Sequence, residues 1–265
     1  MKPIRALSFA LLALIPSIAS ADIGINFVGG APTGNNGVLG AGGVKAMAAD
    51  ESAGVVPQTH WNNAGSADND KRFANNTGTI AGALTDEAGN VLKTASVAWH
   101  ANNCFSINIP DQAGNNRLMR GYLDSEGPAD SHYTSSTTTV TITVPDEYAK
   151  TGYDVYLYFD GGSTAGKQDR VGRFRLFDGK TNTGKAAKEI YGKDSWKVDF
   201  KDKFIEATGS SEKDATAGNY IVFHDVKFAT FTLDATGVTA DVPRAPINAI
   251  QIVRKKEDYK NATPP

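Results

Sequence analysis

The chain has 265 residues, of which 27 are basic, 29 are acidic and 40% are hydrophobic, so its formal net charge is −2. This near balance gives no electrostatic reason to expect binding to nucleic acid, and the apolar fraction excludes an intrinsically disordered chain. With 27 Gly, 23 Thr and 18 Asn, the composition favours many short strands joined by turns over a helical bundle.

Residues 1–21 have the pattern of a secretory signal peptide. Lys2 and Arg5 precede an apolar run from Ala6 to Ile18, and Ala19-Ser20-Ala21 is a small-x-small cleavage site. The run is too short for a comfortable membrane span. We therefore expect cleavage near Ala21, secretion to the periplasm or the extracellular space, and no membrane insertion.

Residues 22–265 are expected to form a single all-β domain, an antiparallel, jelly-roll-like β-sandwich of about ten strands. Alternation of apolar and polar side chains predicts strands at 22–28, 78–84, 95–99, 105–109, 137–144, 153–160, 171–177, 196–200, 220–226, 228–233 and 247–253. One or two short helices are expected, within 115–123 and 185–191. No Pro/Ser-rich linker divides the chain, and strands without crossover helices favour a sandwich.

Familiar catalytic and metal-binding patterns are incomplete in this sequence. The segments 161–168 and 179–186 match G-x-x-x-x-G-K but lack the final Ser or Thr that would hold magnesium. The four histidines are scattered, and Asp68-Asn69-Asp70 begins like a calcium loop without its Gly and distant Glu. We expect no cofactor, with a structural calcium ion left open, and no catalytic residue.

Two smaller expectations concern single residues. Cys104 is the only cysteine, so no intramolecular disulfide can form, and its alternating surroundings predict a small buried residue on a strand. Asp124, Glu126 and Asp130 are expected to be solvated in a polar loop.

Large aromatic residues stand beside side-chain amides and charges at several places in the sequence. Aromatic faces stack on the C–H patches of sugar rings, while Asn, Asp and Arg hydrogen-bond sugar hydroxyls. Trp99 is in phase with core residues of its strand, so we expect it in the core, whereas Tyr156 and Tyr158 should face away from it. The candidate ligand-binding residues are Trp61, Asn62, Asn63, Tyr156, Tyr158, Asp160 and Arg170.

Several segments together resemble a module of secreted bacterial surface proteins. They are Ile-Gly-Ile-Asn-Phe-Val-Gly-Gly at 23–30, Ala-Gly-Val-Val-Pro-Gln-Thr-His-Trp-Asn-Asn-Ala at 53–64, Tyr-Asp-Val-Tyr-Leu-Tyr-Phe-Asp at 153–160, Gly-Asn-Tyr-Ile-Val-Phe at 218–223 and Ala-Pro-Ile-Asn-Ala-Ile-Gln-Ile-Val at 245–253. The module is a poorly characterised jelly-roll type, similar to galactose-binding-like carbohydrate-binding domains. The resemblance implies a β-sandwich and a carbohydrate ligand, and it carries over no catalytic motif.

The leading hypothesis is an exported, non-catalytic module that binds extracellular polysaccharide or sits at the cell surface. One alternative is an enzyme, a hydrolase or lyase, that acts on polysaccharide through the same surface. Another is a structural or adhesive surface protein that self-associates through an exposed strand edge.

Overall fold

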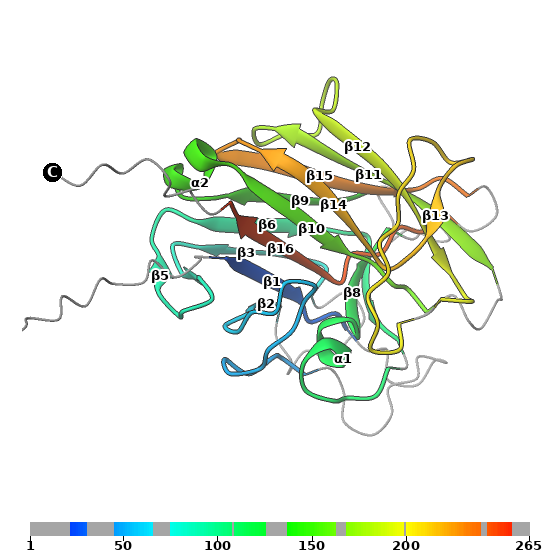
Figure 1. Ribbon diagram of the computed structural model, residues 1–265, viewed down its shortest axis with the longest axis horizontal. Coiled ribbons are helices and arrows are strands. Elements are labelled where there is room, and N and C mark those ends of the chain that lie inside the picture. The colour runs from blue at the N-terminus through cyan, green and yellow to red at the C-terminus, as the bar shows by residue number, and fades with distance from the viewer. Residues whose placement is uncertain are drawn as a thin grey trace, which may run out of the picture.

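The computed structural model is an all-β sandwich in which two large sheets share one hydrophobic core (Figure 1). The structure describes residues 22–30, 45–65, 75–107, 109–125, 137–162, 168–198, 200–239 and 243–255. The predicted signal peptide, residues 1–21, lies outside these ranges. Among the described residues there are sixteen strands, more than the ten expected, because several are only two to four residues long.

Most strand pairs in the two sheets are antiparallel; β1 with β2 and β12 with β13 are parallel. The first sheet has the order β14 (Tyr220–Val226), β10 (Tyr153–Tyr158), β16 (Ala249–Arg254), β1 (Ile23–Phe27), β2 (Asn62–Ala64). The second has the order β13 (Thr216–Ala217), β12 (Lys188–Ser195), β11 (Asp169–Asp178), β15 (Thr230–Gly237), β9 (Thr137–Thr143), β6 (Ser96–His100), β3 (Thr77–Ala81).

Two small antiparallel pairs and two short helices complete the described part. The pairs are β4 (Leu84–Thr85) with β5 (Val91–Leu92), and β7 (Asn103–Ser106) with β8 (Gly121–Asp124); the helices are α1 (Asn115–Leu118) and α2 (Asp146–Thr151).

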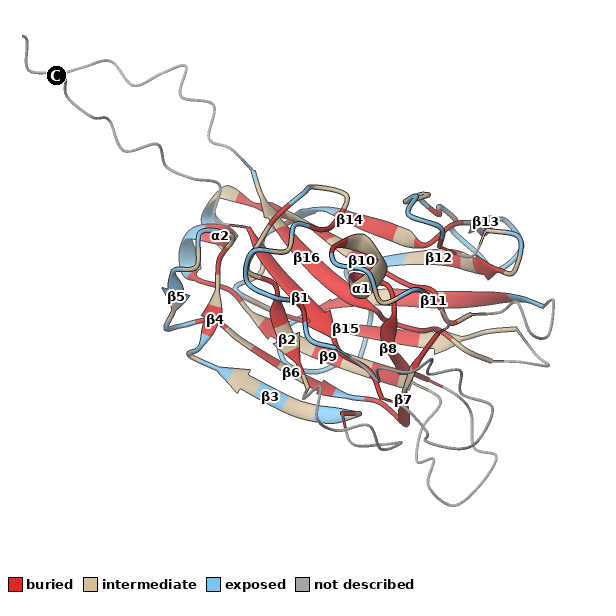
Figure 2. Ribbon diagram, turned by 90° about the horizontal axis from the view of Figure 1, so that it is seen from below, coloured by how far each residue is buried: buried red, intermediate tan, exposed pale blue. Residues whose placement is uncertain are grey.

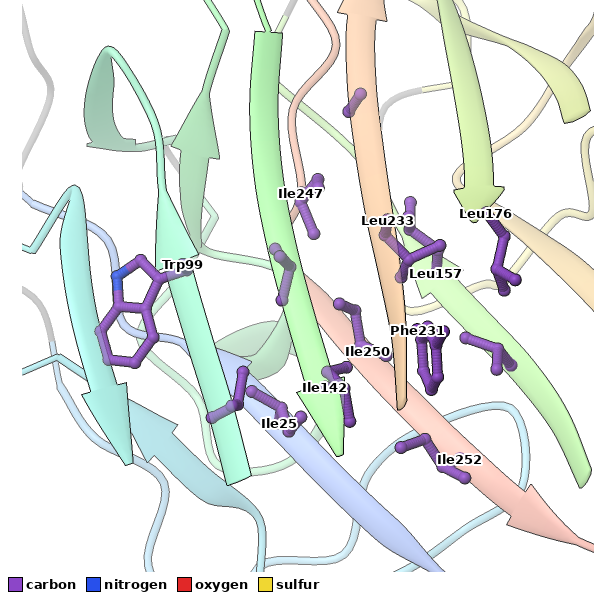
Figure 3. Close-up of a cluster of buried hydrophobic side chains, with 14 of the residues drawn as sticks. Ile25, Trp99, Ile142, Leu157, Leu176, Phe231, Leu233, Ile247, Ile250 and Ile252 are labelled. Atoms are coloured by element: carbon purple, nitrogen blue, oxygen red, sulfur yellow. The ribbon is translucent and has the colours of Figure 1, made fainter. Parts of the chain in front are cut away.

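The core forms because alternate residues of both large sheets point between them (Figure 3). Ile25 and Leu157 from one sheet and Ile142 and Phe231 from the other are all fully buried. Trp99 belongs to the same cluster, as expected from its phase on the strand, and its Nε1 donates a hydrogen bond to the Asn75 carbonyl at 2.9 Å.

A second hydrophobic cluster covers the outer face of the five-stranded sheet. It joins Tyr158 and Ala249 of that sheet to Met47, Trp61 and Phe200, with other members from α1 and its flanking segments. Figure 2 shows the consequence, since β1, β10 and β16 are buried along most of their length. The five-stranded sheet is therefore a middle layer, and only parts of its outer face reach the surface.

Three expected elements differ from the structure. Residues 185–191, expected as a helix, lead into β12, because eight residues from Lys188 to Ser195 pair with β11. Of residues 196–200, expected as a strand, Trp196 and Lys197 lie in a turn closed by the hydrogen bond from Val198 N to the Ser195 carbonyl, so β12 ends at Ser195. In 115–123 the helix ends at Leu118 and a strand, β8, begins at Gly121. Tertiary pairing overrides local propensity in such short segments.

Candidate functional site

Tyr156 and Tyr158 face outward from β10, as the alternation of the strand predicts, but they differ in exposure. The alternating residues Val155 and Leu157 belong to the core. On the outer face, Tyr156 is half-buried and Tyr158 is fully buried. The Tyr158 hydroxyl donates to Gln251 Oε1 at 2.7 Å and accepts from the Val55 amide at 2.8 Å. Burial raises the pKa of Tyr158 far above its usual value.

Trp61 covers Tyr158 together with Phe204. The Trp61 ring meets the Tyr158 ring edge-on, with centroids 6.3 Å apart, and the Phe204 centroid lies 5.2 Å from that of Tyr158. Trp61 is only 4% exposed, and its Nε1 donates to the Gln58 carbonyl at 3.1 Å. Protein atoms therefore cover the Trp61 and Tyr158 rings. In this conformation the contacts between the rings hold the segment around Trp61 onto the five-stranded sheet.

Asn62 and Asn63 make the hydrogen bonds that attach β2 to its surroundings. Asn62 Oδ1 accepts from the Thr85 amide, and its Nδ2 donates to the carbonyls of Gly24 and Thr85. Asn63 Oδ1 accepts from Asn26 Nδ2 and from the Met47 amide. Because these polar groups already have protein partners, the two amides stabilise the loop arrangement in the described structure.

Tyr156, Phe204 and Tyr220 form a partly exposed aromatic cluster, which we call the tyrosine patch. All three are half-buried. The rings of Tyr156 and Tyr220, on neighbouring strands, are inclined by only 26° with centroids 6.2 Å apart, and Phe204 stands edge-on to Tyr220. Of these three residues, the sequence pattern identified only Tyr156. The pairing of β10 with β14, which brings Tyr220 beside Tyr156, joins residues far apart in the chain.

Carboxylates border the tyrosine patch. The Tyr220 hydroxyl donates a long hydrogen bond, 3.5 Å, to Oε2 of the exposed Glu206. Burial, followed by the nearby charges of Asp154 and Glu206, raises the pKa of Tyr156, and burial with Glu206 does the same for Tyr220. Both phenols therefore stay neutral at physiological pH and can donate or accept hydrogen bonds.

One end of the patch carries a polar group of four residues, His224, Asp154, Asp225 and Lys255. His224 Nδ1 lies 2.9 Å from Asp154 Oδ2, and the Asp225 amide donates to Asp154 Oδ1 at 2.9 Å. Asp225 also forms an ion pair with Lys255. These groups place several hydrogen-bonding side chains beside the aromatic surface.

Asp160 and Arg170 come together at the other end, where β10 ends and β11 begins. Asp160 accepts from the amides of Phe200 at 2.6 Å and Gly162 at 3.0 Å. Arg170 Nη1 donates to the Gly161 carbonyl at 3.4 Å, and the Gly161 amide donates to Asp194 Oδ2. Arg170 is 8% exposed, and its Nε has no hydrogen-bond partner in the structure.

Tyr122 adds a phenol to this second cluster, which we call the end cluster and define as Tyr122, Asp124, Asp160, Arg170 and Asp194. Burial raises the pKa of Tyr122 well above its usual value, and the charges of Asp124, Arg244, Arg170 and Asp194 also act on it. Asp124 is 1% exposed on β8, so the expectation of a solvated loop residue was wrong. Glu126 and Asp130 lie outside the described residues.

The remaining features of the described ranges are potential metal ligands, the cysteine and the helices. No three His, Cys, Asp or Glu side chains there are close enough to hold a metal ion, and Asp68 to Asp70 lie outside them. Cys104 is fully buried on β7, as expected. None of the described helices is long and apolar enough to cross a membrane.

Comparisons with protein-family models, curated proteins and solved structures found no match to this chain.

Proposed function

We propose that this protein is an exported, non-catalytic carbohydrate-binding module that recognises extracellular polysaccharide through the tyrosine patch. One observation carries the proposal: two nearly parallel tyrosine rings are partly exposed on adjacent strands and are bordered by carboxylates. The resemblance to galactose-binding-like domains and the signal-peptide pattern support the same function.

The chemistry of the patch suits a sugar better than an apolar ligand. An aromatic ring offers a flat apolar face for the C–H side of a pyranose, and each phenol adds a directional hydrogen bond. Glu206 and Asp154 supply acceptors for sugar hydroxyls at the rim. The Tyr220 ring also contacts the buried Tyr158 ring, with centroids 6.2 Å apart, and Tyr156 packs against Tyr220. These contacts hold the aromatic surface in place before a ligand arrives, which reduces the entropy lost on binding.

Binding to a panel of soluble glycans, followed by calorimetry on the best ligand, tests this proposal. Replacing Tyr156 or Tyr220 with Ala should weaken binding by about 1–3 kcal/mol, the usual cost of losing an aromatic anchor. Tyr191→Ala is the matched control, because Tyr191 is also half-buried but lies on the other sheet. A folded protein that binds no glycan, or Tyr156 and Tyr220 variants that bind as well as the control, would refute the proposal.

The end cluster is the observation that favours the second candidate, an enzyme acting on polysaccharide. A phenol, several carboxylates and an arginine gathered in one place are groups that hydrolases and lyases use. Their burial in the described structure favours the binding function over this one, because a reacting bond must reach them. Release of shorter products from the glycan panel, abolished by Tyr122→Phe, would establish the enzyme and overturn the non-catalytic assignment.

A further inference from the structure

The carboxylates that border the tyrosine patch differ in whether the protein itself neutralises them. Asp154 Oδ2 lies 2.9 Å from His224 Nδ1, and its Oδ1 lies 3.9 Å from Lys255 Nζ. Glu206 is exposed, and within the described part of the chain its side chain has only the long hydrogen bond from the Tyr220 hydroxyl, 3.5 Å, and no ion pair. One carboxylate charge beside the rings is therefore open to a ligand.

The electrostatic potential at the two exposed phenols is negative. Burial raises the pKa of Tyr156, and the charges of carboxylates raise it further, with Asp154 and Glu206 acting most strongly. Burial and then Glu206 act in the same direction on Tyr220. At Tyr148, by contrast, a nearby arginine lowers the pKa in part. Because only negative charges act on the two phenols, a positively charged group is attracted to this surface.

The aromatic rings of the patch add a second attraction for a cation. The face of an aromatic ring carries negative partial charge, so an ammonium group within about 6 Å of the ring centroid is stabilised. In the described part of the chain, cations of the protein lie over other rings, those of Phe177, Trp196 and Tyr148. The rings of Tyr156 and Tyr220 are half-buried and hold no such cation, so they remain available to a cationic ligand.

The charge of the patch distinguishes three classes of polysaccharide. A polymer with carboxylate or sulfate groups is repelled by Glu206 and Asp154. A neutral polymer stacks on the rings and gains ordinary hydrogen bonds. A polymer of amino sugars with free amines also stacks, and each ammonium group can donate a charge-assisted hydrogen bond to a carboxylate, which is stronger than one between neutral groups. Charge complementarity therefore favours the third class.

We propose that the tyrosine patch selects polysaccharides built from amino sugars whose amines are free and protonated, and that Glu206 determines this specificity by accepting a hydrogen bond from the ammonium group. The proposal rests on the proposed function, because it names the ligand class of the same site. Glu206 lies at the hydroxyl end of the Tyr220 side chain. A substituent of a sugar ring stacked on Tyr220 therefore comes within reach of this carboxylate.

Calorimetry at mildly acidic pH, comparing a glucosamine hexamer with its fully N-acetylated counterpart, tests the proposal. The two ligands share a backbone, but only the first carries ammonium groups. The protein should bind the charged hexamer about fivefold more tightly, the contribution of one partly exposed ion pair. Glu206→Gln should remove most of this preference and leave binding of the acetylated hexamer unchanged. Glu212→Gln, the same change at an exposed residue outside the patch, should keep the preference. Thermal unfolding checks that every variant is folded.

The possible failures are distinguishable. If the acetylated hexamer binds through Tyr156 and the charged hexamer binds no more tightly, this inference is wrong and the proposed function stands. If the folded protein binds no glycan at all, both are wrong. Equal loss of the preference in Glu206→Gln and Glu212→Gln would show a general attraction to an acidic protein and would overturn the inference. So would a lysine hexamer that competes as well as the glucosamine hexamer, because the site would then recognise cations rather than amino sugars.

Discussion

Removing the hydroxyl oxygen of Tyr158 should loosen the segment 53–61, which lies on the outer face of the five-stranded sheet. The hydroxyl bridges Gln251 Oε1 and the Val55 amide, while Gln251 Nε2 donates to the Val56 carbonyl at 2.6 Å and to Gln58 Oε1 at 2.9 Å. Tyr158→Phe keeps the ring and its packing but leaves a buried acceptor and a partly buried donor without their partner. Each such group costs about 1–3 kcal/mol, so we expect a loss of about 2–6 kcal/mol in unfolding free energy.

Urea denaturation of Tyr158→Phe measures this loss, and amide hydrogen exchange locates it. The Val55 amide and its neighbours in 53–61 should exchange faster, whereas core amides should change only with the global stability. Tyr156→Phe is the matched control, because no hydrogen bond of its hydroxyl supports that segment, and it should change stability by less than about 0.5 kcal/mol. Equal stabilities for the two variants, or unchanged exchange at Val55, would refute the assigned role of the Tyr158 hydroxyl.

Three further perturbations test other parts of the fold. Burial raises the pKa of Tyr122, Tyr148, Tyr153 and Tyr158 more strongly than that of the other tyrosines. Above pH 10 the unfolded chain therefore binds fewer protons than the folded one, and the unfolding free energy should fall by about 1.4 kcal/mol per pH unit for each of these four residues. Tyrosinate absorbance should then rise together with loss of circular dichroism, and ionisation of all tyrosines in a folded protein would contradict this. Arg175→Ala should lower the unfolding free energy measured in urea by about 3–5 kcal/mol, because it removes the ion-pair partner of the fully buried Asp234, whose Oδ2 lies 2.6 Å from Arg175 Nη2. A loss below about 1 kcal/mol would show that the remaining hydrogen bond from Asn182 is enough to hold Asp234 in place. Gly24→Ala would place a Cβ 2.5 Å from the Trp61 ring, so the melting temperature should fall by the equivalent of about 1–3 kcal/mol, and an unchanged value would show that Trp61 can move aside.

Local sequence was informative wherever alternation was regular. It identified an all-β sandwich, the strands around 23–27, 137–143 and 153–158, and the core position of Trp99. It was wrong at 185–191, where pairing with β11 decides the structure, and at 196–200, where a turn begins directly after Ser195. Export, the carbohydrate ligand and the resemblance to galactose-binding-like domains remain predictions.

The candidate site shows the same division. Alternation by itself determined that Tyr156 and Tyr158 point away from the core, because side chains on a strand alternate between the two faces. Only the tertiary structure decided that Trp61 and Phe204 cover Tyr158 while Tyr156 stays accessible beside Tyr220. Likewise, Glu206 is visible in the sequence, but its place beside Tyr220 depends on the pairing of two separate segments. The face of a sheet that a side chain takes is set by its position along the strand. The segments that cover that face are set by contacts between residues far apart in the chain.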